Sequence, residues 1–219
     1  MKNRFARFLY RLGISANFLT LFGLTLAAFS GWLILRGEHF AAAIALLFSG
    51  LVDLMDGEVA RVSGKQSRFG GILDSSFDRY GDAFMFAGLM AHFFMTGRAD
   101  LAALTASGWT GAFLISYVRA RAECEVDSCR VGFWERGERI GVLVIGLASG
   151  NAAAAVWILG IGTHWTVFQR LYAAYRLAHS EASTRQAPPF FLKTRRRSEA
   201  VYFAKVVLLA AFLLFVRIP

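Results

Sequence analysis

The chain has 219 residues, of which 56% are hydrophobic and 21 are phenylalanine, and its mean hydropathy is +0.48. A soluble domain does not normally carry so much apolar surface, and apolar runs of about 20 residues, the length of a bilayer-spanning helix, recur along the sequence. The net charge of +9 fits basic loops beside anionic lipid, and we expect no nucleic-acid partner because there is no soluble domain to bind one.

The predicted elements are all helices. Residues 1–13 alternate basic and apolar side chains, which is typical of an amphipathic helix on a membrane surface. The last apolar segment, 201–217, is short for a span, so crossing tilted, packing on the bundle and lying at the interface all stay open. The expected fold is an all-α integral membrane protein with an N-terminal amphipathic surface helix, about six transmembrane helices and a C-terminal apolar helix. The spans are expected at 17–35, 40–56, 69–95, 101–118, 140–149 and 152–169.

Basic residues gather in every second loop, which by the positive-inside rule places both flanks in the cytoplasm. We therefore expect a multi-pass protein of the cell (inner) membrane whose stretch 53–82 faces the cytoplasm. Residues 1–176 are expected to form the membrane domain, and 177–219 a basic cytoplasmic segment followed by the apolar helix. Cys124 and Cys129 are expected to be reduced cytosolic thiols. The basic loops lie near 61–68, 119–139 and 176–197, and the turns with few basic residues at 36–39, 97–100 and 149–152.

Five aspartates fall within residues 53–82, between segments apolar enough to lie in a membrane. They form two groups with internal spacings of three and of four residues, which place each group on one face of a helix. Two helices that meet near their ends would direct both groups at one point. Like charges at membrane depth are costly unless neutralised, and a hard divalent cation such as Mg²⁺ or Mn²⁺ suits an all-carboxylate set. The first group is Asp53 and Asp56, and the second is Asp74, Asp78 and Asp82.

A helix cap or an ion pair with Arg61 or Arg79 would explain one such aspartate, but not five in this pattern. A cation transporter is the alternative from another functional class, since carboxylates within a membrane mark ion paths. The glycines and arginines among the aspartates favour a phosphate ligand instead. Gly57 would let a nucleotide approach the backbone, and Arg61 could neutralise a phosphate oxygen. A carboxylate partly free of metal could act as general base on an attacking hydroxyl.

The same stretch contains the full signature D-x2-D-G-x2-A-R-x8-G-x3-D-x3-D, so the sequence resembles the CDP-alcohol phosphotransferases. The resemblance covers about residues 1–176 and implies six transmembrane helices around a polar cavity open to the cytoplasm. It implies that an alcohol attacks the lipid-side phosphorus of a CDP-linked lipid, such as CDP-diacylglycerol, and that CMP leaves. The signature positions are Asp53, Asp56, Gly57, Ala60, Arg61, Gly70, Asp74 and Asp78.

The resemblance also assigns roles to residues. Two Mg²⁺ ions, with Mn²⁺ as a possible substitute, would be held by the four signature aspartates. Asp53 and Asp74 would bridge both ions, and Asp78 would also be the catalytic base. The predicted metal ligands are Asp53, Asp56, Asp74 and Asp78, and the predicted CDP-lipid contacts are Ala16, Asn17, Phe18, Leu19, Gly57, Arg61 and Ser67.

The acceptor alcohol is not named by the signature. The segments GGILDSSFDRYGDA, SYVRARAE and GFWERGERI resemble the phosphatidylinositol-phosphate synthases, which implies inositol phosphate as acceptor and a homodimer. A phosphorylated acceptor needs additional cations, and the resemblance gives this role to Arg119, Arg139 and Arg170. Anchoring of helix ends at anionic headgroups is the alternative for these arginines. Phosphatidylglycerophosphate synthase is the alternative function, because it also takes a phosphorylated alcohol.

Overall fold

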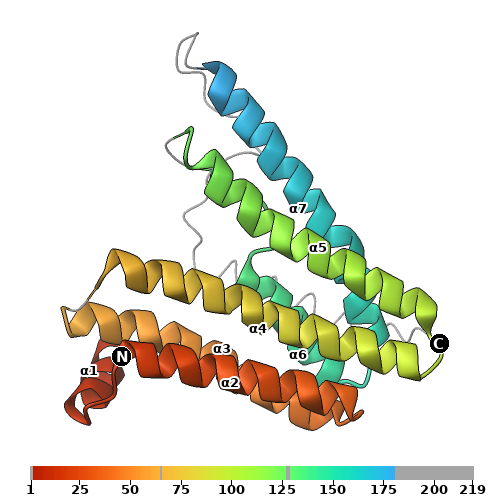
Figure 1. Ribbon diagram of the computed structural model, residues 1–219, viewed down its shortest axis with the longest axis horizontal. Helices are drawn as coiled ribbons and strands as arrows, with labels where there is room; N and C mark the ends of the chain where they lie inside the picture. The colour runs from red at the N-terminus through yellow and green to blue at the C-terminus, as the bar shows by residue number, and fades with distance from the viewer. Residues whose placement is uncertain (1, 65, 127–128, 181–219) are drawn as a thin grey trace. The chain divides into compact units, whose positions relative to one another are not determined.

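The computed structural model describes residues 2–64, 66–126 and 129–180, and every regular element in this part of the chain is an α-helix (Figure 1). The predicted all-helical class is therefore confirmed. The helix expected at 201–217 and most of the tail at 177–219 lie outside the described residues. The helices are α1 (Lys2–Arg11), α2 (Ala16–Leu35), α3 (His39–Val62), α4 (Arg68–Met95), α5 (Ala99–Ala122), α6 (Arg136–Ala148) and α7 (Ala152–Ser180).

Three of the described helices, α2, α3 and α5, are long and apolar enough to cross a membrane. This points to a membrane protein, while the count of six spans and the surface location of α1 stay predictions. The helix α4 has 28 residues, which is ample length, but its first half carries the polar sequence RFGGILDSSFDRYGD. The polar residues that lower the mean hydropathy of α4 thus include the aspartates predicted as metal ligands, Asp74 and Asp78.

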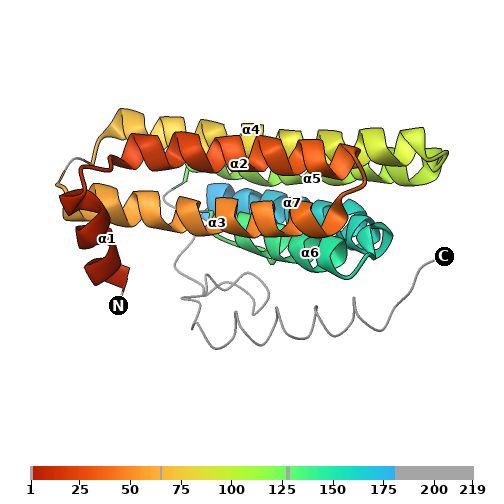
Figure 2. The same cartoon turned by 90° about the horizontal axis from the view of Figure 1, so that it is seen from below.

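The chain divides into two compact units after Arg98. In the first unit, α2 packs against both α3 and α4, and α1 packs against α3 (Figure 2). Ala6, Leu19 and Val59 form a buried cluster that joins α1, the start of α2 and the last turns of α3. The last turns of α3 carry the signature residues Asp56, Gly57, Ala60 and Arg61, so apolar burial there fixes the position of this part of the signature.

Two glycines set the closest approach of α2 to α4. A β-carbon at Gly31 would collide with the carbonyl oxygen of Phe84, and one at Gly88 would collide with the carbonyl oxygen of Gly31. The two backbones therefore touch where side chains normally separate helices, as at the small-residue crossings of membrane helices. The first unit depends on glycine at both positions.

The structure extends α3 beyond the predicted end at residue 56. The helix runs to Val62, and Gly64, with φ of +65°, follows its end. A left-handed glycine is a common helix terminator, whereas Gly57 keeps negative φ inside the helix. Gly57 and Arg61 therefore lie on the same helix as the first aspartates rather than in a turn. In the same way α7 continues past 169 to Ser180, so that Arg170 lies within a helix.

In the second unit, α5 and α7 run side by side (Figure 1), and α6 packs against α7. Gly108 faces Gly160 at this contact, and the Ser107 hydroxyl lies 3.1 Å from His164 Nε2. Residues 123–135 connect α5 to α6, and we refer to them as the α5–α6 loop. The described part of this loop lies against α7, where Arg170 donates a hydrogen bond to the Val131 carbonyl.

Candidate metal and nucleotide site

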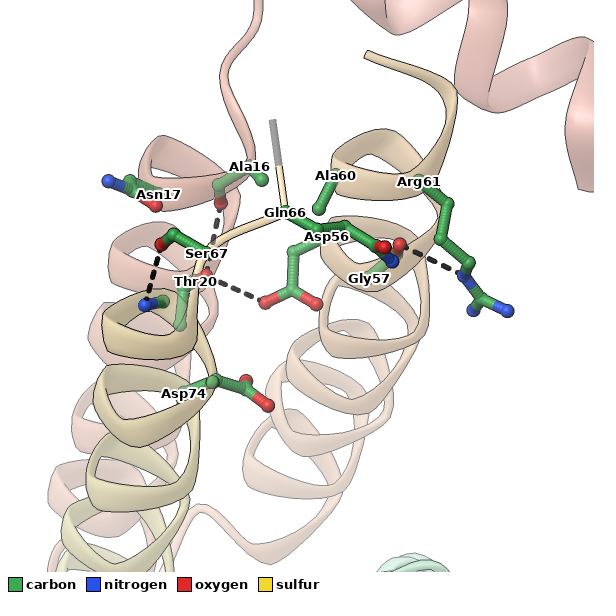
Figure 3. A pocket seen from close by; sticks show the side chains of 12 residues that line it. Ala16, Asn17, Thr20, Asp56, Gly57, Ala60, Arg61, Gln66, Ser67 and Asp74 are labelled. Carbon is green, nitrogen blue, oxygen red and sulfur yellow. Dashed lines mark hydrogen bonds between the residues drawn. The ribbon is translucent and has the colours of Figure 1, made fainter. Parts of the chain in front are cut away.

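Three of the four predicted metal ligands lie together in the first unit. Asp53 and Asp56 come from α3 and Asp74 from α4, and one carboxylate oxygen of each lies within 4.8 Å of the others. This approaches the roughly 4 Å between oxygens on opposite sides of one Mg²⁺ ion. Figure 3 shows the Asp56 and Asp74 carboxylates extending into the same space between their helices. The donor set is all oxygen and all anionic, so it fits a hard divalent cation that would offset the mutual repulsion.

Asp56 is the most enclosed of the three, with 6% of its surface exposed. Thr20 on α2 donates a hydrogen bond of 2.8 Å from its hydroxyl to Asp56 Oδ2. The same hydroxyl lies 3.0 Å from the carbonyl of Ala16, but it has one hydrogen, and a carboxylate is the stronger acceptor. Thr20 was not among the predicted site residues. The sequence does hold one indication of this role. Thr20 lies one helical turn after Ala16, which is a predicted nucleotide contact, so both residues lie on the same face of the helix.

A cavity of about 350 Å³ opens beside these carboxylates, which is within the usual size range of small-molecule sites. It is lined by the first turns of α2 and α4, the last turns of α3 and the residues just before α4 (Figure 3). Much of its wall is glycine or alanine, so that a ligand can approach the backbone closely. The lining residues are Ala16, Asn17, Thr20, Asp56, Gly57, Ala60, Arg61, Gln66, Ser67, Gly70, Gly71 and Asp74.

Most of the predicted CDP-lipid contacts line this cavity, but Phe18 and Leu19 do not. Phe18 is 57% exposed and stacks on Phe22, while Leu19 is buried against Ala6. The reason is helical geometry, because consecutive residues of α2 point in different directions and only one face meets the cavity. Gln66 and Gly71 also line the cavity and were not among the predicted contacts.

The side chain of Arg61 lies at the rim. Its Nε donates to the Gly57 carbonyl at 3.2 Å, and its Nη2 pairs with Glu58 Oε1 at 3.0 Å. In Figure 3 the guanidinium points away from Asp56 and Asp74. A cation here neither cancels the carboxylate cluster nor occupies the space between the helices.

Asp78 and Asp82 lie outside the group of three. Asp78 is one turn beyond Asp74 on α4, and its Oδ2 is 3.4 Å from Arg79 Nη1. Asp82 lies a further turn along and is 4% exposed. The predicted roles of Asp78 as metal ligand and base therefore stay predictions.

The three arginines predicted for the acceptor lie near one another in the second unit. Arg139 and Arg170 are each 2% exposed, and the charges of Arg119 and Arg139 both act on Arg170. Arg119 is the accessible member, with 34% of its side chain exposed, and its Nε pairs with Glu123 at 3.0 Å. Glu123 and Glu135 offset part of this positive charge, and three arginines gathered this closely make the cluster a candidate anion site.

The pair of Glu123 with Arg119 lies where α5 meets the α5–α6 loop. Burial by itself would favour the neutral acid of Glu123, but the hydrogen bond and charge of Arg119, with the backbone N–H of Cys129, outweigh it and lower the pKa of this carboxyl. Glu123 therefore joins the end of α5 to the far side of the loop. Burial also raises the pKa of the Cys129 thiol, which is fully enclosed.

The model of the CDP-alcohol phosphatidyltransferase family matches residues 13–177. Among similar proteins, the archaetidylinositol phosphate synthase of Pyrococcus horikoshii is 33% identical over 172 residues, covering 78% of this chain and 89% of the relative. The phosphatidylinositol phosphate synthase of Mycobacterium tuberculosis is 33% identical over 183 residues, covering 78% of this chain and 83% of the relative.

Two solved structures of the Mycobacterium tuberculosis phosphatidylinositol phosphate synthase PgsA1 are similar to this fold. The one with CDP-DAG bound has a TM-score of 0.76 and 29% identity, covering 86% of this chain and 99% of the other. The complex with manganese and citrate has a TM-score of 0.76 and 27% identity, covering 90% of this chain and 100% of the other. The sequence-based assignment is thus confirmed, and the chain belongs to the CDP-alcohol phosphatidyltransferase family.

Proposed function

We propose that this transferase moves a phosphatidyl group from CDP-diacylglycerol to a hydroxyl of inositol phosphate, giving phosphatidylinositol phosphate and CMP. The observation that carries the proposal is the three-carboxylate group beside a cavity of nucleotide size, on the elements that bear the signature. In the reaction the acceptor oxygen forms a bond to the lipid-side phosphorus. The phosphoanhydride bond to CMP breaks, CMP keeps the bridging oxygen, and the hydroxyl proton goes to a base.

The carboxylates of Asp53, Asp56 and Asp74 would hold the metal. We propose that two Mg²⁺ ions bind there and that Mn²⁺ can replace them. When bound, the metal supplies positive charge for the diphosphate and for the charge that develops during displacement. The manganese complex of the related PgsA1 supports dependence on a divalent metal. Thr20 keeps Asp56 oriented for this role by its 2.8 Å hydrogen bond.

The chain's own residues would bind the nucleotide and remove the proton. Gly57 and Ser67 bring backbone and hydroxyl groups to the cavity wall, and the start of α2 closes its other side. Arg61 would exchange Glu58 for a phosphate oxygen, which requires only a rotation of an exposed side chain. Asp78, one turn from Asp74, would accept the proton of the acceptor hydroxyl.

The acceptor's phosphate would meet the cluster of Arg119, Arg139 and Arg170. Two similar proteins with inositol phosphate synthase names, one bacterial and one archaeal, support this acceptor. We infer from the positive-inside pattern that the site faces the cytoplasm, and from the family resemblance that the enzyme is a homodimer. Phosphatidylglycerophosphate synthase is the alternative within the class, because a phosphorylated acceptor of another kind would also suit the arginines.

The proposal is tested by incubating the purified protein with CDP-diacylglycerol, Mg²⁺ and single alcohols while CMP release is measured. Inositol phosphate should give turnover, whereas free inositol and serine should give little. Turnover with glycerol phosphate alone would reject the acceptor and keep the reaction class. The family match favours this enzyme over the cation transporter. Arg61→Ala separates the two functions. The enzyme predicts that this variant releases CMP much more slowly, whereas a transporter would carry metal into proteoliposomes equally well with and without the substitution.

A further inference from the structure

The α5–α6 loop is held to its unit by a buried arginine. We propose that Arg170 is a positioning residue, which fastens this loop between α5 and α7 and so keeps Arg119 and Arg139 together as one anion site. The inference rests on the proposed function, because it assigns Arg170 a way of acting in acceptor binding. It adds a second role, holding the loop in place, to the acceptor-phosphate contact proposed above for the arginine cluster.

The guanidinium of Arg170 is committed to two carbonyl groups from different segments. Its Nε donates to the Val131 carbonyl in the loop at 3.0 Å, and its Nη1 donates to the Ile115 carbonyl on α5. Only 2% of Arg170 is exposed, so these bonds form away from competing water. A planar guanidinium donates in two directions at once, which the single ammonium of lysine cannot reproduce in the same geometry.

Two further contacts tie the same loop to α7. The Thr166 hydroxyl accepts a hydrogen bond of 3.2 Å from the backbone N–H of Trp134, and the Cys129 thiol lies 3.7 Å from the Arg170 carbonyl. Thr166 and Cys129 are both 0% exposed. The loop from 129 to 134 is thus part of the packed unit rather than a solvated connection.

The loop connects directly to the arginines in question. Ile115 lies one turn before Arg119 on the same face of α5. Arg139, in the first turn of α6, donates from Nη1 to the carbonyl of Trp134 in the loop at 3.2 Å. Arg170 therefore holds both the helix that bears Arg119 and the segment that orients Arg139. Because the charges of Arg119 and Arg139 act unfavourably on Arg170, the cluster would spread apart if these carbonyl contacts were lost.

The loop's packing can be read from the accessibility of Cys129. The chain has two cysteines, so Cys124→Ser leaves Cys129 as the single thiol. In that background maleimide labelling of the full-length protein should be slow. It should accelerate about tenfold or more in Arg170→Gln and in Thr166→Val, because both changes free the loop. Ser107→Ala, at the α5–α7 contact but outside the loop, is the matched control and should leave labelling unchanged.

The second readout is acceptor affinity. Arg170→Gln and Thr166→Val should raise KM for the phosphorylated acceptor about tenfold, while KM for the CDP-lipid changes less than about twofold. Arg170→Lys keeps the charge but not the two-directional contact, so it should behave like Arg170→Gln. The Thr166 variant removes no charge and therefore separates loop position from electrostatics.

Protection of Cys129 in both Arg170→Gln and Thr166→Val would overturn the proposal, as would full acceptor affinity in Arg170→Lys. A parallel rise in KM for the CDP-lipid would also overturn it, since that marks a general structural defect. Labelling needs no substrate, so it tests the role of Arg170 in holding the loop whichever alcohol the enzyme uses. The acceptor screen with unaltered protein tests the proposed function by itself.

Discussion

Thr20 Oγ1 donates a 2.8 Å hydrogen bond to Asp56 Oδ2, and this contact links α2 to the carboxylate group formed by α3 and α4. It connects a helix that lines the candidate nucleotide cavity with the most enclosed of the candidate metal ligands. A partner that orients a ligand carboxylate usually matters almost as much as the ligand itself.

Thr20→Val should lower CMP release about tenfold and raise the Mg²⁺ concentration needed for half-maximal rate, because Asp56 loses the donor that orients it. Thr25→Val is the matched control. Thr25 lies on the same helix, and its hydroxyl donates to the carbonyl of Leu21, away from the site. Equal Mg²⁺ dependence in the two variants would show that the Thr20 contact does not serve the metal.

Asp78→Asn should reduce turnover by about 10² to 10⁴, the usual contribution of a general base, and leave CDP-lipid binding largely intact. Rates and nucleotide binding are measured on the same preparation. Ser76→Ala, on the exposed side of the same helix, controls for helix disturbance. If weak nucleotide binding were the main defect, Asp78 would be chiefly a metal ligand rather than the base.

Gly31→Ala should destabilise the protein by about 1–3 kcal/mol, because the added methyl group collides with the Phe84 carbonyl at the contact of α2 and α4. Thermal unfolding in detergent measures this as a lowered Tm. A β-carbon at Gly141 in α6 meets no atom within 4 Å, so Gly141→Ala should leave Tm unchanged or slightly higher. Equal Tm for the two variants would mean that α2 and α4 do not approach as described.

The α5–α6 loop should loosen in acid. The pKa of Glu123 is lowered in the folded protein, so its stabilising contribution is present at neutral pH and is lost as the pH falls through that lowered value. Labelling of Cys129 with a dithiodipyridine, which reacts with thiols in acid, should accelerate over that range in the Cys124→Ser background. Glu123→Gln should label rapidly at neutral pH as well. Acid-independent labelling of the parent would show that Glu123 does not hold the loop.

The grouping of three aspartates could be predicted from the sequence because they lie at helical spacings on two helices. Asp53 and Asp56 share one face of α3, and Asp74 begins the matching face of α4, so helical periodicity placed their carboxylates together. The extension of α3 to Val62 was not predicted, because Gly57 and Gly64 are both residues that favour turns and the helix could have ended at either. The glycine with positive φ is Gly64, and the sequence alone does not indicate which of the glycines adopts this conformation.

Contacts between distant segments could not be predicted. Thr20 reaches Asp56 across 36 positions, and Arg170 reaches Ile115 across 55. No local pattern encodes such contacts, since they arise only when the helices pack. The role of Arg170 illustrates this, because a basic residue near a predicted helix end suggests a surface charge, whereas the packed unit buries it against carbonyl groups.

Binding of Mn²⁺ to the purified protein, followed by the loss of its free-ion signal in electron paramagnetic resonance, tests the carboxylate centre most directly. The unaltered protein should bind Mn²⁺ without nucleotide, and Asp56→Asn and Asp74→Asn should each weaken binding by about tenfold or more. Asp82→Asn, on the same helix as Asp74 but outside the group, should bind as the unaltered protein does. Equal Mn²⁺ affinity in all four proteins would contradict a metal centre built from these aspartates.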